Sequence, residues 1–195
     1  MGEKILNIIK ESIETKQKLV RCLEDIKNVV GIIIDCYKSN KKVIVFGNGG
    51  SAADAQHFAA ELVNKFKLDR KPLAAIALTT NSSVLTAIGN DYGYDFVFSK
   101  QIEALCNKGD VVIGITTSDA SDSGHSVNIM NALRKAKECS AKTVGLFSEK
   151  TNNLLQEVDF AIIAPSRNTP RIQEAHGLIC HIICELVETE LFNKS

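Results

Sequence analysis

The hydrophobic and polar positions of this chain follow two different periods. From residue 3 to residue 38, apolar residues return every three to four positions, beginning with Ile5, Ile9 and Ile13. This is the period of one face of an α-helix, and the pattern allows a break near residues 14–17. The segment lies outside the strand–helix repeat that follows, so its apolar face must pack on the chain's own sheet or on another subunit. We favour another subunit, because the stripe is long and the core that follows looks complete.

Beyond residue 39 the chain alternates short apolar runs with helical segments. The expected strands are residues 43–46, 73–78, 111–115, 143–147 and 160–163, and the expected helices are residues 51–66, 81–88, 95–106, 127–139, 152–157 and 169–192. Thr169 followed by Pro170 is typical of a helix start, with Thr169 as the capping residue.

This alternation predicts a parallel sheet with helices on both faces. The expected fold class is α/β: a three-layer, flavodoxin-like or Rossmann-like arrangement around a five-stranded parallel sheet, with an added N-terminal helical segment. We expect a single domain over residues 1–195, in which residues 1–38 form a helical oligomerisation segment and residues 39–195 the α/β core.

A glycine-rich turn follows the first expected strand. It reads Gly47-Asn48-Gly49-Gly50-Ser51 and leads into an alanine-rich helix. Glycine lets the backbone turn sharply and approach a ligand closely, and the first amides of the helix suit a phosphate. The spacing is neither that of a dinucleotide fingerprint nor that of a P-loop. Alternatively, Ser51 only caps its own helix, since residues 51–54 fit a capping box.

Polar groups elsewhere fall where they could face this turn. His57 and Glu61 stand four residues apart and share one helix face, although they could also be a surface ion pair. The loop at residues 116–123 is rich in hydroxyl and carboxyl groups and follows the third strand. At the carboxyl edge of a parallel sheet such a loop can hold a phosphate; the alternative is a solvated surface loop.

The composition argues against several classes of protein, among them nucleic-acid-binding and membrane proteins. The 195 residues are 45% apolar and 24% charged, with 23 basic and 23 acidic side chains, so bulk charge draws the chain neither to nucleic acid nor to a membrane. No apolar run is long enough to span a bilayer, and the N-terminus is too charged for a signal peptide. The six cysteines form no C-x-x-C pair. We interpret them as buried free thiols of a cytoplasmic protein, and rank a metal site at Cys180 and Cys184 below that.

Four long motifs run through the chain: GNGGSAADAQHFAAELV from residue 47, PLAAIALTTNSSVLTAIGNDYGYDFVFSKQIEAL from residue 72, GDVVIGITTS from residue 109 and TPRIQEAHGLICHIICELVE from residue 169. Together they resemble the phosphoheptose isomerase family of the sugar isomerase (SIS) superfamily. The resemblance extends over nearly the whole chain from about residue 40, and the helical N-terminus fits it as well.

The resemblance implies an aldose–ketose isomerase that converts sedoheptulose 7-phosphate to D-glycero-D-manno-heptose 7-phosphate through a cis-enediol, for activated-heptose and surface-polysaccharide biosynthesis. It also implies a homotetramer with sites at subunit interfaces and one zinc ion per subunit. Glu61 and His181 match the acid/base pair of the family. The zinc ligands fall on His57, Glu61, Gln173 and His181, and the sugar-phosphate contacts on Asn48, Gly49, Gly50, Ser51, Glu61, Asn90, Asp91, Thr116, Thr117, Ser118, Ser121 and Gln173.

The residue types suit this chemistry. Moving a carbonyl between neighbouring carbons needs one group to take a carbon-bound proton and another to move protons between the oxygens. A carboxylate and an imidazole can do both at neutral pH, and a metal ion would polarise the carbonyl. Gln173 and His181 are eight residues apart, close to one helix face. His176, on the same helix, is the competing histidine, which we interpret as structural.

One loop departs from the family pattern. Where the family reads S-T-S-G-N-S, this chain reads Thr116-Thr117-Ser118-Asp119-Ala120-Ser121, and the loop is longer. Asp119 places a negative charge beside a phosphate site, which disfavours binding. Asp119 must therefore point away, or phosphate binding is weakened, or the substrate differs; His125, turned inward, would offset the charge. If the charge matters, Asp119→Gly should lower the Michaelis constant.

Two other functions remain open at the level of sequence. One is a non-catalytic SIS tetramer that binds a replication initiator protein, and the other is a sugar-phosphate sensor without turnover. The presence of both Glu61 and His181 favours the enzyme, whereas the altered loop keeps the sensor open.

Overall fold

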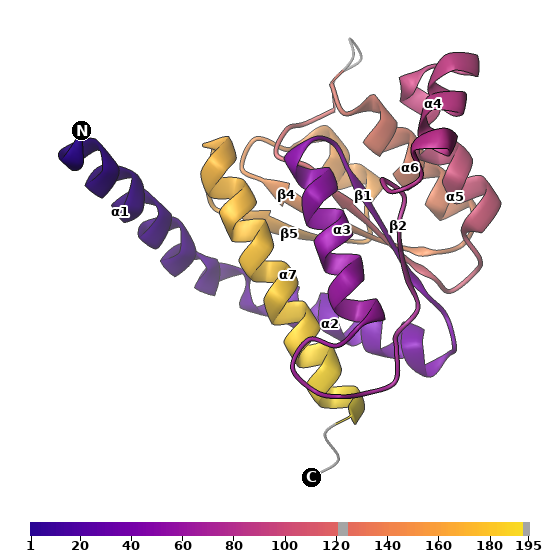
Figure 1. Ribbon diagram of the computed structural model, residues 1–195, viewed down its shortest axis with the longest axis horizontal. Coiled ribbons are helices and arrows are strands. Elements are labelled where there is room, and N and C mark those ends of the chain that lie inside the picture. Colours follow the sequence, from indigo (N-terminus) through magenta and orange to yellow (C-terminus); the bar gives the residue numbers. More distant parts are fainter. Residues whose placement is uncertain (121–124, 193–195) are drawn as a thin grey trace.

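The computed structural model describes residues 1–120 and 125–192 and places a parallel sheet between two layers of helices (Figure 1). The sheet has five strands in the order β2-β1-β3-β4-β5. Their bounds are β1 Val43–Gly47, β2 Ala75–Ala77, β3 Val111–Ile115, β4 Lys142–Ser148 and β5 Phe160–Ala164. All four pairings are parallel. The predicted three-layer α/β fold with a five-stranded parallel sheet is thus confirmed, with β2 shorter than the apolar run that predicted it.

The helices follow the predicted segments closely. They are α1 Gly2–Lys18, α2 Leu23–Lys38, α3 Gly50–Val63, α4 Ser82–Asp91, α5 Ser99–Leu105, α6 Val127–Glu138 and α7 Thr169–Phe192, with 3₁₀ turns η1 Leu19–Cys22, η2 Tyr94–Phe96 and η3 Asn153–Glu157. The break in the N-terminal helix lies at η1, later than the predicted residues 14–17.

The start of α7 differs from the predicted cap by one residue. The amide of Ile172 donates to the carbonyl of Asn168, so Asn168 occupies the capping position and Thr169 is already helical. Pro170 still lies in the first turn, where its missing N–H leaves no intrahelical bond unmade.

The sheet separates two hydrophobic cores. Successive side chains of a strand point to opposite faces, and in β1 Val43 and Val45 join the core under α2, α3 and α7. Ile44 and Phe46 join the core under α5 and α6 on the other face. Every residue of β1 and β3 is buried, which explains why these strands read as continuous apolar runs.

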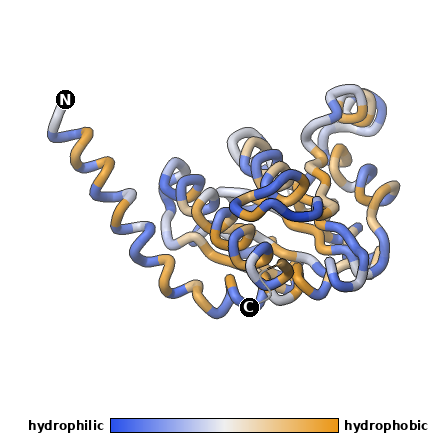
Figure 2. Tube along the Cα trace, turned by 60° about the horizontal axis from the view of Figure 1, so that its bottom comes forward, coloured by the Kyte–Doolittle hydropathy of each residue, from blue (hydrophilic) through white to orange (hydrophobic). Residues whose placement is uncertain are grey.

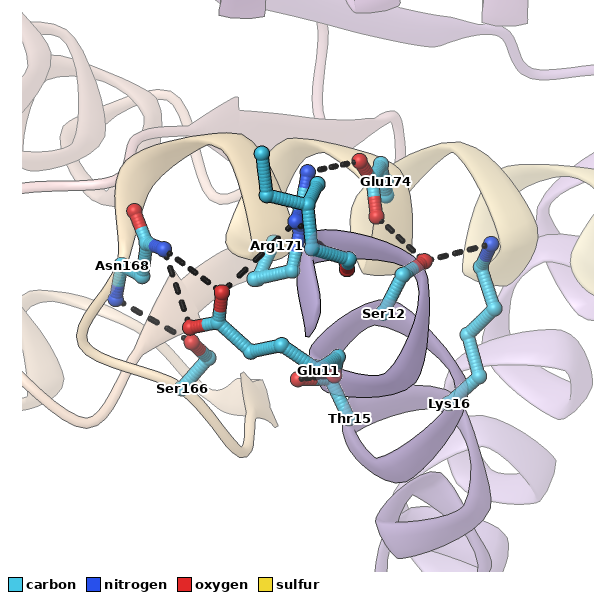
Figure 3. Close-up of polar contacts among 9 residues, drawn as sticks. Glu11, Ser12, Thr15, Lys16, Ser166, Asn168, Arg171 and Glu174 are labelled. Atoms are coloured by element: carbon cyan, nitrogen blue, oxygen red, sulfur yellow. Dashed lines mark hydrogen bonds and ion pairs between the residues drawn. The ribbon is translucent and has the colours of Figure 1, made fainter. Parts of the chain in front are cut away.

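The N-terminal helix is attached through polar contacts to the start of α7. Figure 3 shows the contact: Arg171 lies between Glu11 of α1 and Glu174 of α7, and it donates to the carbonyl of Ile8. Ser12 donates to Glu174 at 2.6 Å, and Asn168 donates to Glu11 at 2.9 Å.

The N-terminal part of α1 projects away from the body of the protein (Figures 1 and 2). Its apolar residues alternate with polar ones along the tube in Figure 2, and Ile5, Ile9 and Ile13 are each about half exposed. Within the described residues this stripe is therefore not covered by the chain's own sheet. None of the helices in the described part of the chain is long and apolar enough to cross a lipid bilayer.

Candidate functional site

A polar pocket opens at the carboxyl ends of β1 and β3. These two strands are neighbours, and the chain leaves them in opposite directions along the sheet, toward β2 and toward β4. Such a switch point is where ligands bind in open α/β sheets. The pocket has a volume of about 280 Å³, and its lining residues are Asn48, Ser51, Tyr94, Asp95, Thr116, Thr117, Ser118, His125, Ser126, Asn128 and Gln173.

The glycine-rich turn brings the start of α3 to this pocket. A Cβ on Gly47 would lie 2.7 Å from the carbonyl oxygen of Ser51, so the turn is too tight for any other residue there. Gly49 has a φ of 56° and is the N-cap of α3, without a side-chain capping bond. Ser51 is therefore already helical, and its interpretation as the cap of a capping box is wrong. Its buried side chain lines the pocket instead.

The loop after β3 supplies the opposite wall. The Thr116 hydroxyl accepts from the Ser118 amide at 3.1 Å and lies 3.0 Å from the Ser118 carbonyl, which closes a tight turn. The Ser148 hydroxyl donates to the Thr117 carbonyl at 3.2 Å, so β4 also holds the loop. Thr116, Thr117 and Ser118 thus all line the pocket, and their binding of a phosphate stays a prediction.

Asp119 points away from the pocket. Its carboxylate accepts from the amides of Asn153 at 2.9 Å, Leu154 at 3.2 Å and Ala120 at 3.0 Å. Burial alone would raise the pKa of Asp119, but bonds from these amides and that of Asn152 hold its pKa below the ordinary value. Of the three alternatives for this residue, the structure shows the first. His125 lies at the pocket, as expected if it turned inward.

His57, Glu61 and His181 form a cluster between α3 and α7. The Nε2 atom of His57 lies 2.9 Å from a carboxylate oxygen of Glu61 and 3.5 Å from Nε2 of His181. The two imidazole rings meet edge to face, and the ring of Phe66 lies against His181 with centroids 5.4 Å apart. One ligand atom from each of the three residues lies within 4.8 Å of those from the other two.

Gln173 connects this cluster to the pocket along one seam. Helices α3 and α7 lie side by side (Figure 1), and Gln173 lies so close to Gly50 that a Cβ there would be 2.1 Å from its Nε2. His181 lies eight residues further along α7, or about 12 Å at the rise of an α-helix. Along this contact between α3 and α7, the pocket lies at the N-terminal ends of the two helices, and the histidine–glutamate cluster lies about two turns further along them.

The remaining predicted residues lie elsewhere. Asn90 and Asp91 are exposed at the end of α4, bonded to each other at 2.8 Å, and do not line the pocket. Ser121 lies outside the described residues. His176 is buried, with Nε2 2.8 Å from the Phe147 carbonyl. Burial lowers the pKa of His176 to about 4, which agrees with the structural role expected of it.

Sequence reasoning missed one buried polar residue of the pocket. Asn128, at the start of α6, exchanges two hydrogen bonds of 2.9 Å with Asn48, one from each amide group. The pair joins the glycine-rich turn to the N-terminus of α6. Asn128 stands in an ordinary amphipathic pattern, and only its contact with Asn48 identifies it.

Relatives of this chain, found both by sequence and among solved structures, are similar to it over nearly its whole length. The SIS domain profile matches residues 4–148. The phosphoheptose isomerase of Clostridium acetobutylicum is 52% identical over 189 residues, covering 95% of this chain and 94% of that protein. The phosphoheptose isomerase of Aquifex aeolicus is 48% identical over 196 residues and covers 100% of both. The solved phosphoheptose isomerase of Neisseria gonorrhoeae has a TM-score of 0.88 at 38% identity, covering 96% of this chain and 98% of that one.

Proposed function

The chain belongs to the SIS domain family, among the phosphoheptose isomerases, and on this premise we propose the reaction that its site performs. The enzyme is an aldose–ketose isomerase that converts sedoheptulose 7-phosphate to D-glycero-D-manno-heptose 7-phosphate, a step in heptose biosynthesis. The observation that carries this function is the contact between α3 and α7, where a cluster of ionisable groups follows a polar pocket of about 280 Å³.

The pocket suits the phosphate group of the substrate. The N-terminus of α3 lies at the pocket, so the positive end of the helix dipole favours an anion there. The hydroxyls of Ser51 and Ser118 can donate to the phosphate, and Gly49 leaves the backbone uncovered, because nothing lies where its Cβ would stand. The carboxylate that the sequence places in this loop, Asp119, is bonded to η3, so its charge does not oppose phosphate binding.

Glu61 and His181 move the protons. The ketose loses a proton from C1 to give a cis-enediol, and the aldose forms when a proton arrives at C2; the hydroxyl proton moves between O2 and O1. A carboxylate and an imidazole that share one cluster can hold these protons in turn. His57, bonded to Glu61 at 2.9 Å, orients the carboxylate.

Zinc is the metal that the donors of the cluster fit. Two imidazole nitrogens and one carboxylate are ordinary ligands of catalytic zinc, and those of His57, Glu61 and His181 lie close together. Gln173 is the fourth proposed ligand; its side chain lies against Gly50, so it would have to turn along α7 toward His181 to join the other three. When bound, zinc would act as a Lewis acid toward the substrate carbonyl.

The enzyme acts as a homotetramer in the cytoplasm. The half-exposed apolar stripe of α1 supports association, because a helix face of this kind is stable only when another surface covers it. A site shared between subunits would also give Asn90 and Asp91 a role, since they lie outside the pocket of their own chain. All six cysteines are free thiols, which supports a reducing compartment.

Purified protein incubated with sedoheptulose 7-phosphate tests the reaction. The expected result is the aldose 7-phosphate, detected by chromatography against a standard. Binding of the ketose without any product would instead support the sugar-phosphate sensor. No binding, together with capture of a replication initiator, would support the scaffold, which the similarity to isomerases and the assembled cluster do not favour.

A further inference from the structure

The seam between α3 and α7 ends in a buried ion pair. Beyond the histidine–glutamate cluster, Arg70 and Glu188 meet with Nε 3.1 Å from a carboxylate oxygen, and both side chains are only 2% exposed. Arg70 follows α3, and Glu188 lies on α7, two turns beyond His181. A buried pair of this kind is stable only when hydrogen bonds satisfy its remaining polar atoms.

The remaining polar atoms of Arg70 donate to carbonyls at the C-terminus of α3. One guanidinium nitrogen donates to the carbonyls of Leu62 at 2.8 Å, Asn64 at 2.8 Å and Lys71 at 3.2 Å. The other donates at 2.9 Å to the carbonyl of Glu61, the residue whose side chain belongs to the cluster. The last carbonyls of a helix lack partners within it, and a cation there also complements the helix dipole.

Glu188 holds the segment that follows α3. Its carboxylate accepts from the amides of Phe66 at 3.3 Å, Lys67 at 2.7 Å and Leu68 at 3.1 Å. Burial would raise the pKa of Glu188, but these bonds and the Arg70 charge hold it below its ordinary value. The same bonds fix the backbone of Phe66, whose ring lies against His181.

We infer that Arg70 and Glu188 are positioning residues, which set the placement of Glu61 relative to His181. The inference rests on the proposed function. One end of the pair is bonded to the backbone of Glu61, and the other fixes the ring against which His181 lies. The pair thus joins the two helices that supply the cluster, and an error of about 1 Å in such a placement can cost about a hundredfold in rate.

Two conservative variants and a matched control test this role. Arg70→Lys keeps the charge but loses the fork of donors, and Glu188→Gln keeps the shape but replaces one acceptor with a donor. The control is Asp110→Asn. Asp110 is also buried and accepts from Lys42 Nζ at 2.5 Å and from the Asn107 amide at 2.8 Å, but neither partner belongs to α3 or α7, the helices that supply the cluster.

All proteins are assayed well below the unfolding temperature of the least stable one. We expect Arg70→Lys and Glu188→Gln to lower kcat by about tenfold or more, with KM changed less than about threefold, since the phosphate pocket is untouched. Asp110→Asn should lose stability yet keep kcat within about twofold. The ring signals of His57 and His181 in histidine NMR spectra should shift in the first two proteins and not in the control.

The inference would be overturned if all three variants had the kcat of the wild-type protein and histidine signals at the wild-type positions. If Arg70→Lys and Glu188→Gln do not fold, Phe66→Leu takes their place, because it removes the ring from His181 and leaves the ion pair intact. An unchanged kcat and an unchanged His181 signal in Phe66→Leu would then overturn the inference. Failure of the proposed function is a separate result: wild-type protein would not turn over the ketose, while the histidine signals would still report the positioning.

Discussion

Nε2 of His181 lies 3.5 Å from Nε2 of His57, although 124 residues separate them in the chain. Glu61 completes the group from one turn further along α3. Two imidazole nitrogens and a carboxylate at these distances can share a proton or hold a metal ion. This makes the cluster the place where substitutions should separate chemistry from folding.

Removing the ionisable groups of the acid/base pair should abolish most turnover. Glu61→Gln and His181→Asn each keep similar size, and neither side chain is fully buried. We expect kcat to fall by roughly 10²–10⁴-fold in each, as for other acid/base groups, with little change in unfolding temperature. Steady-state kinetics with sedoheptulose 7-phosphate gives the answer, and full activity in both variants would remove the roles proposed for them.

Zinc binding should depend on the three residues of the cluster, His57, Glu61 and His181. We expect about one zinc per chain in the purified protein, with loss of zinc and of activity after chelation, and return of both on adding zinc. His57→Ala should bind zinc at least about tenfold more weakly, whereas His125→Ala, which changes a histidine of the pocket, should bind it normally. Elemental analysis and a zinc titration measure this, and equal affinity in both variants would contradict the ligand set.

Substitution by alanine should have different effects at two glycines of the turn, Gly47 and Gly50. A Cβ on Gly47 would lie within 2.8 Å of two backbone oxygens, those of Ser51 and Ile115, so Gly47→Ala should destabilise the fold by roughly 1–3 kcal/mol or more. A Cβ on Gly50 meets only the end of the Gln173 side chain. Gly50→Ala should therefore displace Gln173 and impair the site with a smaller stability loss. Urea unfolding and kinetics on both variants measure the contrast.

Replacing Asp119 by glycine should weaken substrate binding, opposite to the effect expected if its charge faced the phosphate. The carboxylate accepts from the amides of Asn153 and Leu154 and so holds the loop that follows β3 to η3. Without it we expect KM to rise about three- to tenfold, given about 1 kcal/mol for such a bond. A lower KM in Asp119→Gly would show that the charge does act on the phosphate.

Stability should fall as the pH drops from 6.5 toward 4. Burial lowers the pKa of His176 to about 4 from 6.5, so below pH 6.5 the unfolded chain binds a proton that the folded chain does not. The stabilisation is fully present above pH 6.5 and lost as pH falls through this window, by roughly 3 kcal/mol in total. Urea unfolding at several pH values measures the slope, which His176→Asn should reduce; an equal slope in that variant would assign it to other groups.

The sequence determined those features that depend on local interactions. The strand and helix periods predicted the sheet, because burial on both faces requires continuous apolar runs such as that of β1. The turn at Gly47–Gly50 predicted a site at the start of α3, where a pocket does lie; that this pocket binds an anion stays a prediction. The spacing of His57 and Glu61 placed both on one helix face, and motif resemblance added His181 as their partner.

The tertiary structure decided the direction of those side chains that bond to residues far away in the sequence. Asp119 turns away from the pocket because free amides of η3 lie beside it, and no local pattern carries that information. The Asn48–Asn128 pair and the Arg70–Glu188 pair likewise join residues far apart in sequence. A buried polar group must find its partner wherever the fold has placed one. For this reason the sequence could name the groups at the site, and only the packing of α3 against α7 could bring them together.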